Sequence, residues 1–372
     1  MRSAGFEPAI SHLRLDSVYI LRRVNLVMNN NRQIRKGYLF IIVFISTIIF
    51  SSTTLINGFT NVVYGQTNAT QANSTNNVTG LVNTQDIPLQ KVRVGDIEMA
   101  YKMFGKGDPI LLISPAQADM NYWEPSLIGT LSANHTVIVF DNRGVGNTST
   151  GIKPFSIQQF ANDTAGLLDA LKIQKADVLG YSLGSFIAQQ LAVTHPDKVN
   201  RLVLIATTCG GKESIPPSPE PQKRVIDVIN RIANDTPVTS QEVKALLSDG
   251  LGSGWLKLHP NFLETIPIPE VKDLFPSITP DNNLKQFKAA LDWEASNWNG
   301  VCDELRKISI PTLIITGTDD IIPTQNALII AGKIPGAWLI QIKDAGHAIP
   351  IQYPAEVAEI LNTFLTTTSP NN

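Results

Sequence analysis

The chain has 372 residues, of which 43% are hydrophobic and 17% charged, and its formal net charge is −2. This length and apolar content allow one large domain or two with a substantial core, and the near-neutral charge provides no basic field for nucleic acid, so no nucleic-acid partner is expected. Two cysteines, Cys209 and Cys302, fit neither a metal cluster nor a disulfide-dense scaffold.

The first 65 residues are typical of a targeting region. Residues 38–50 form a largely apolar run behind a cluster of basic residues, the pattern of a secretory signal. Because no charged residue occurs from 37 to 85, a retained membrane anchor is the alternative. We assign residues 28–65 to a signal peptide or anchor and place residues 1–27 outside the mature protein. The protein is therefore expected to be secreted or tethered to the outer face of the cytoplasmic membrane.

A polar segment follows. Residues 66–77 contain only Gln, Thr, Asn, Ala and Ser, a composition that cannot bury enough apolar surface to fold. Residues 66–84 are predicted to be a flexible linker, and residues 85–367 to form the folded domain.

Within that domain, short apolar runs alternate with amphipathic segments. Strands are predicted at residues 97–103, 110–114, 136–141, 176–182, 201–207, 312–317 and 338–343. Helices are predicted at residues 157–171, 185–193, 325–334 and 355–364. Strands that are apolar throughout and alternate with helices favour an α/β fold with a mainly parallel central sheet and helices on both faces.

The alternation stops at about residues 210–300. Four prolines between residues 216 and 221 are expected to break the chain. Amphipathic segments follow, and one begins at Thr239, where Glu242 three residues later gives a capping-box signature. This stretch is predicted to be a mostly helical cap insertion. Its apolar residues, Trp255 among them, are expected either to line a pocket or to pack inside the cap.

Cys209 and Cys302 lie at the two ends of this insertion. An extracellular location permits a disulfide between them, and two buried thiols are the alternative. The sequence leaves both open.

A G-x-S-x-G motif occupies residues 180–184, where the strand at 176–182 meets the next helix. Glycines on both sides of Ser182 indicate a tight, strained turn that presents the hydroxyl beside a helix N-terminus. Alone, the motif arises easily by chance, so it needs catalytic partners.

Those partners are sought at the carboxyl ends of other strands, where open α/β sheets bind ligands. Asp319 and Asp320 follow one strand, and His347 follows the last. The spacing from Gly317 selects Asp320 rather than Asp319. The order Ser182, Asp320, His347 is that of a hydrolase with a nucleophile elbow.

These motifs together resemble the α/β-hydrolase superfamily, in its capped branch with a serine nucleophile. The resemblance spans about residues 90–365 and rests on residues 141–146, 180–184, 317–320, 346–347 and 352–354, with a cap segment at 255–260. It implies acyl transfer to water, with Ser182 as nucleophile, His347 as base and Asp320 orienting the imidazole.

The resemblance also implies an oxyanion hole made by the backbone amides of Ala116 and Leu183. Here the sequence departs from its relatives, because Ser114 and Pro115 replace the usual His-Gly. Proline lacks an N–H, but the donor would be the amide of the following residue. A second departure is the shortened link from Asp320 to the next proline.

The expected substrate is a small acyl compound: an ester, thioester, lactone or amide, with carboxylic esters preferred. No metal or cofactor is implied. A serine at the turn argues against relatives that use aspartate on haloalkanes or epoxides. Trp123, Tyr181 and Trp255 are candidate substrate-binding residues. A cofactor-free perhydrolase and a non-catalytic binding protein on the same scaffold are the alternatives.

Overall fold

The computed structural model describes residues 18–21, 82–234, 236–265 and 277–368. Its centre is a nine-stranded sheet with the order β1-β9-β8-β7-β6-β4-β5-β3-β2. The strands from β9 to β5 in this order run parallel, whereas β1, β3 and β2 pair antiparallel at the two edges. The strand bounds are β1 Val18–Leu21, β2 Gln90–Val94, β3 Ile97–Gly105, β4 Asp108–Ile113, β5 His135–Phe140, β6 Ala176–Tyr181, β7 Val199–Ile205, β8 Thr312–Gly317 and β9 Trp338–Ile342. The prediction of a mainly parallel α/β sheet is confirmed.

All seven predicted strands are present, and two further strands lie at the sheet edges. The alternating residues of the central strands enter two apolar clusters on opposite faces of the sheet, which explains why these strands are apolar throughout. β1 pairs with β9 and falls within residues 1–27, whose exclusion from the mature protein stays a prediction.

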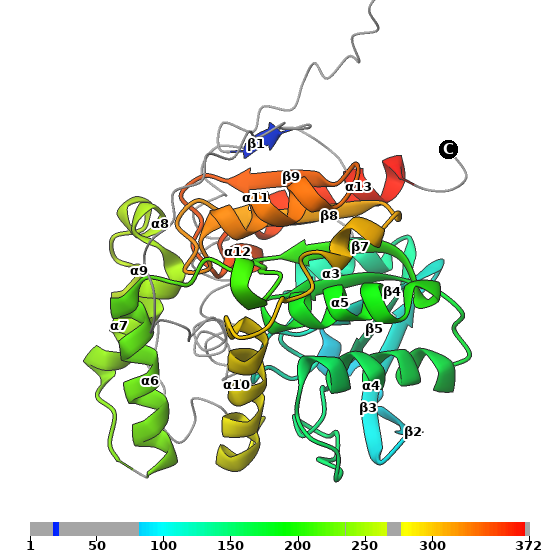
Figure 1. Cartoon of the computed structure of the whole chain (residues 1–372), viewed down its shortest axis with the longest axis horizontal. Coiled ribbons are helices and arrows are strands. Elements are labelled where there is room, and N and C mark those ends of the chain that lie inside the picture. The colour runs from blue at the N-terminus through cyan, green and yellow to red at the C-terminus, as the bar shows by residue number, and fades with distance from the viewer. Residues whose placement is uncertain (1–17, 22–81, 235, 266–276, 369–372) are drawn as a thin grey trace, which may run out of the picture.

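Helices cover both faces of the sheet (Figure 1). α4 (Ile157–Ala170), α5 (Leu183–Thr194) and α11 (Thr324–Lys333) pack into one apolar cluster. α3 (Pro125–Ser132) and α13 (Pro354–Thr367) pack into the other, and a short helix, α12 (Ile349–Gln352), precedes α13. The four helices predicted for the sheet domain are therefore present, and α3 and α12 are additions.

The described residues between β7 and β8 form helices, and Figure 1 shows α6 to α9 gathered to one side of the sheet. We call this region the cap. Its helices are α6 (Pro219–Ala233), α7 (Ser240–Leu251), α8 (Ser253–Leu258), α9 (Phe262–Thr265) and α10 (Pro280–Glu294). The capping box at Thr239 is confirmed, since the side chains and backbone amides of Thr239 and Glu242 bond reciprocally.

The expectation that all four prolines break the chain is wrong for two of them. Pro219 and Pro221 lie in the first turn of α6. The amide groups of a first turn have no partner inside the helix, so proline costs nothing there, and its fixed φ favours helical geometry.

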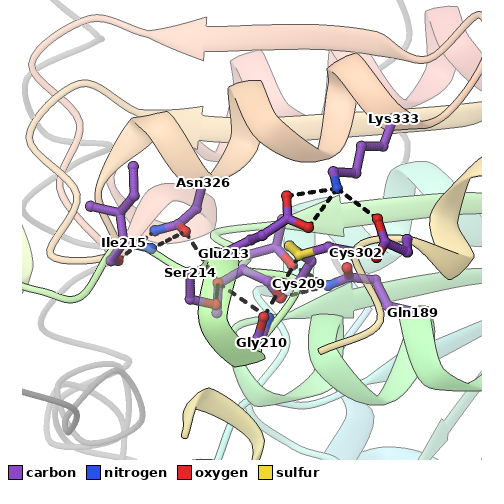
Figure 2. The surroundings of a disulfide bond; sticks show 12 residues. Gln189, Cys209, Gly210, Glu213, Ser214, Ile215, Cys302, Asn326 and Lys333 are labelled. Atoms are coloured by element: carbon purple, nitrogen blue, oxygen red, sulfur yellow. Dashed lines mark hydrogen bonds and ion pairs between the residues drawn. A yellow bond between two sulfur atoms is a disulfide. The ribbon is translucent and has the colours of Figure 1, made fainter. Parts of the chain in front are cut away.

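Cys209 and Cys302 form a disulfide at the base of the cap, with their Cα atoms 5.1 Å apart (Figure 2). The two chain segments also pair through a backbone hydrogen bond from Val301 N to Cys209 O of 3.0 Å. An ion pair between Lys333 and Glu213 lies beside the disulfide in Figure 2. Of the two alternatives that the sequence leaves open, the structure has the disulfide.

Replacing both cysteines with serine is expected to lower the free energy of unfolding by about 2–4 kcal/mol, because the disulfide closes a long loop in the unfolded chain. The sequence separation is 93 residues. Denaturant unfolding of wild type and the double Cys→Ser variant measures the difference. Equal midpoints for the two proteins, together with two free thiols in the wild type, would contradict the bond.

Glu294, at the end of α10, is a carboxyl group buried away from water. Burial raises its pKa from 4.5 to about 8. The folded state thus binds more protons than the unfolded state between these values, so this group's contribution to stability is full below about pH 4.5 and is lost as the pH rises through about 8.

Glu294→Gln is therefore expected to be more stable than wild type at pH 8 and above, by on the order of a few kcal/mol, and similar to it near pH 4.5. Thermal unfolding across this pH range makes the comparison. Glu359→Gln, at an exposed site on α13, is the matched control and should follow wild type. Parallel pH profiles for Glu294→Gln and wild type would refute the expectation.

Among the described residues, no helix has both the length and the apolar character needed to cross a membrane. The predicted signal or anchor at residues 28–65 lies outside the described residues, as do residues 66–81 of the predicted linker.

Candidate active site

Ser182 stands alone between the last residue of β6 and the first residue of α5. Its φ of 53° and ψ of −120° are unusual for a residue with a side chain and cost about 1–3 kcal/mol. A Cβ atom on Gly180 would lie 2.2 Å from Gly184 O, and one on Gly184 would lie 2.0 Å from Ile113 O. Neither position has room for a side chain, so the two glycines make the strained turn sterically feasible.

Three side chains from separate strand ends form one hydrogen-bonded chain. His347 Nε2 lies 2.9 Å from Ser182 Oγ, and His347 Nδ1 lies 2.8 Å from Asp320 Oδ1. With Nδ1 donating to the carboxylate, Nε2 is free to accept the serine proton. The side chains of His347 and Asp320 are fully buried, which strengthens these polar contacts by excluding water.

Asp320, the residue that the spacing selects, is the one that contacts the imidazole. Its Oδ1 also accepts a hydrogen bond of 2.8 Å from Ile322 N, which fixes the carboxylate within its own turn. Asp319 points elsewhere and accepts a bond of 2.7 Å from Gly254 N in the cap. The shortened link to Pro323 therefore does not bring Asp319 to the histidine.

The two predicted oxyanion donors belong to segments that pack together. Leu183 is the first residue of α5, where amides lack partners within the helix. Ala116 is fully buried in the loop after β4. A Cβ on Gly184 would lie 2.9 Å from Ser114 O, so this loop packs against the start of α5. The donor roles stay a prediction.

A family model described as the alpha/beta hydrolase fold matches residues 108–354, which include the turn at Ser182 and the loops of Asp320 and His347. The chain belongs to the α/β-hydrolase family. Its fold, cap and hydrogen-bonded side chains agree with that membership.

This α/β hydrolase is similar to several curated proteins and solved structures. It is 27% identical over 283 residues to a putative carbamate hydrolase of Azorhizobium caulinodans, an alignment that covers 73% of this chain and 96% of the relative. It is 30% identical over 258 residues to a poly(3-hydroxyalkanoate) depolymerase of Ectopseudomonas oleovorans, covering 69% and 84% of the two chains. The structure of a thermophilic esterase from Thermogutta terrifontis superposes with a TM-score of 0.59 at 26% identity, covering 75% of this chain and 99% of the other.

Tyr181, a predicted substrate-binding residue of this α/β hydrolase, contacts the histidine loop. Its hydroxyl donates a hydrogen bond of 2.8 Å to His347 O. Its ring packs against Tyr122 and against the imidazole, with centroid distances of 5.9 and 5.7 Å. These contacts hold the backbone of His347 beside the serine turn.

The two predicted tryptophans are both buried. Trp123 packs edge-on against Tyr122. Trp255 stacks on His259 with ring centroids 4.0 Å apart and meets Phe262 edge-on. The contacts of Trp255 are thus those of packing inside the cap, and its role in substrate binding stays a prediction.

The sequence did not predict the side chains that support the loops of the candidate site. The backbone N–H of Gln117, next to Ala116, donates a hydrogen bond of 2.6 Å to the side-chain oxygen Oε1 of Gln286 on α10. Buried Asp141 accepts bonds of 2.7 Å from Met120 N and Asn147 N, which joins the loops after β4 and β5. Asp141 belongs to a motif that the sequence singles out, whereas nothing local marks Gln286, whose partner lies 169 residues away.

In the part of the chain that the structure describes, no three His, Cys, Asp or Glu side chains are grouped so as to hold an ion.

Proposed function

We propose that the protein is a serine hydrolase that cleaves carboxylic ester bonds of small acyl substrates. The observation that carries the proposal is the buried chain from Asp320 through His347 to Ser182 at a strained turn. A histidine that is oriented by a carboxylate and hydrogen-bonded to a serine is the arrangement that activates a hydroxyl nucleophile.

The reaction follows from these positions. His347 Nε2 takes the proton of Ser182 as Oγ attacks the acyl carbon, and it then delivers the proton to the leaving alcohol. Asp320 stabilises the imidazolium and keeps Nδ1 protonated. The amides of Ala116 and Leu183 stabilise the oxyanion. Water, deprotonated by the same imidazole, releases the acid and restores the serine.

The choice of esters is supported by the names of two relatives. One is a depolymerase of a poly(hydroxyalkanoate), which is a polyester, and one is an esterase. The putative carbamate hydrolase is named for carbamates, which also contain an acyl carbon, so carbamates are the second class of substrate to test. These names describe those proteins, and they give the order in which substrates are tested.

A fluorophosphonate probe and a panel of p-nitrophenyl esters of graded acyl length test the proposal. We expect covalent labelling at Ser182 and measurable turnover of part of the panel, and the preferred acyl length will give the size of the pocket. A protein that neither reacts with the probe nor turns over any ester would instead be a binding protein on this scaffold.

We infer an extracytoplasmic location, secreted or tethered to the outer face of the cytoplasmic membrane. The disulfide between Cys209 and Cys302 supports it, because such bonds persist mainly in oxidising compartments. The basic and apolar pattern of residues 28–65 supports it as well. Fractionation of the source cells with sequencing of the mature N-terminus tests the location and the cleavage together.

A further inference from the structure

The loop that carries His347 is bonded to the cap through its backbone. The amides of His347 and Ala348 both donate to Gly250 O, at 2.6 and 3.3 Å. Gly250 lies in the last turn of α7, where carbonyl groups have no partner inside the helix. The end of a cap helix and the histidine loop therefore satisfy each other's backbone groups.

Gln352 forms a second connection between the same two segments. Its Oε1 accepts a bond of 2.9 Å from Gly346 N, and its Nε2 donates a bond of 2.7 Å to Leu251 O. The side chain is buried. Because both ends of one amide are used, Gln352 fixes the residue before His347 relative to the cap.

The acid loop is bonded to the same part of the cap. Asp319 Oδ2 accepts bonds from Gly254 N at 2.7 Å and from Ser253 Oγ at 3.2 Å. Its own amide donates to Ala345 O at 2.9 Å, so it also touches the histidine loop. We call residues 250–254, from the last turn of α7 to the first turn of α8, the cap turn.

Backbone packs directly against backbone at this junction. A Cβ on Gly346 would lie 2.3 Å from the carbonyl carbon of Leu251. A Cβ on Gly252, whose φ is 73°, would lie 2.7 Å from the Cβ of Asp319. The cap turn consequently has no room to slide over the two loops without breaking these contacts.

We propose that the cap turn positions His347 and Asp320, and that Asp319 and Gln352 are the positioning residues that attach the cap turn to their loops. This inference rests on the proposed function. Proton transfer between Ser182 and His347 depends on a hydrogen bond of 2.9 Å, and a displacement of about 1 Å can cost about 100-fold in rate. The cap turn limits that displacement through its hydrogen bonds to the loops of His347 and Asp320.

The consequence is that this end of the cap is a fixed part of the catalytic apparatus. A cap that only selected substrates would affect mainly KM when its attachment is weakened. A cap that positions His347 and Asp320 affects kcat, because the substrate-contacting surface is unchanged and the base is misplaced.

Two single variants separate these outcomes. Gln352→Met keeps the length of the side chain without its hydrogen bonds, and Asp319→Ala removes the acceptor for the cap turn. Each is expected to lower kcat on the best ester by about 10- to 100-fold, with KM within about threefold of wild type. Asp319→Asn retains an acceptor oxygen for Gly254 N and should restore kcat to within about threefold.

The matched control is Gln190→Met. Gln190 is also a buried glutamine, on α5, and its Nε2 donates 2.8 Å to Gln158 Oε1 away from the cap turn. It should keep wild-type kcat even where its melting temperature falls. If Asp319→Ala, at a partly exposed site, keeps kcat within twofold, or only KM rises, the positioning role is overturned; the same holds if kcat falls equally in the control.

Fluorophosphonate labelling distinguishes this failure from failure of the proposed function. Labelling of wild type at Ser182, with ester turnover, supports the proposed function whatever the variants do. Slower labelling of Asp319→Ala and Gln352→Met than of Gln190→Met supports positioning, and equal rates overturn it. A wild type that neither labels nor turns over any ester overturns both.

Discussion

Replacing Ser182 with alanine is expected to lower turnover of an activated ester by about 10⁴- to 10⁶-fold and to abolish fluorophosphonate labelling, because nucleophile and base act as a unit. The fold should persist, since the alanine removes only the hydroxyl that contacts His347. Steady-state kinetics and thermal unfolding of the same preparations measure both effects.

Ser185→Ala is the matched control. Ser185 is also buried at the start of α5, but its hydroxyl donates to Ser182 O at 2.6 Å and does not meet the histidine. This variant should keep its labelling and most of its activity. Ser182→Ala with activity near wild type would remove the serine from the mechanism.

Asp320→Asn is expected to lower turnover by up to about 10⁴-fold while the fold remains intact. An amide in this position cannot hold the imidazole in the tautomer whose Nε2 accepts a proton. The effect belongs to Asp320 because its Oδ1 lies 2.8 Å from His347 Nδ1.

Asp319→Asn is the neighbouring comparison and should stay close to wild type on the same activated ester. Its carboxylate binds the amide of Gly254, which the oxygen of asparagine can also accept. A severe loss in Asp319→Asn with a nearly normal Asp320→Asn would show that the two side chains have the opposite roles.

The sheet and the serine turn are predictable from the sequence because their signals are local. Strand β8 is observed at the predicted residues. All six of its residues are buried, and the short, largely apolar run that results is typical of a buried strand. The turn at Ser182 requires glycine at two fixed positions, and only a few kinds of backbone need that spacing. Strand β2 lacks such a signal, because it is charged and mostly exposed at the edge. Helix α3, with 8 residues, is too short for a clear period.

The contacts of the cap turn cannot be read from the sequence for a different reason. They join backbone atoms to side chains far along the chain, such as Gln352 to Leu251 across 101 residues. A backbone carbonyl has the same chemistry at every position, so no residue type marks the acceptor. Gln352 is visible as part of a motif, but its second partner is set only by where the cap comes to rest.

The disulfide at the base of the cap also determines how the protein responds to cleavage. Cys209 and Cys302 bracket the cap in the chain, so a protease that cuts once between them leaves two polypeptides joined by a covalent bond. The N-terminal fragment with β2 to β7 and the C-terminal fragment with β8 and β9 then remain one molecule, and the nick is visible by size only after reduction. A single cut in the cap therefore leaves the two parts of the sheet covalently joined.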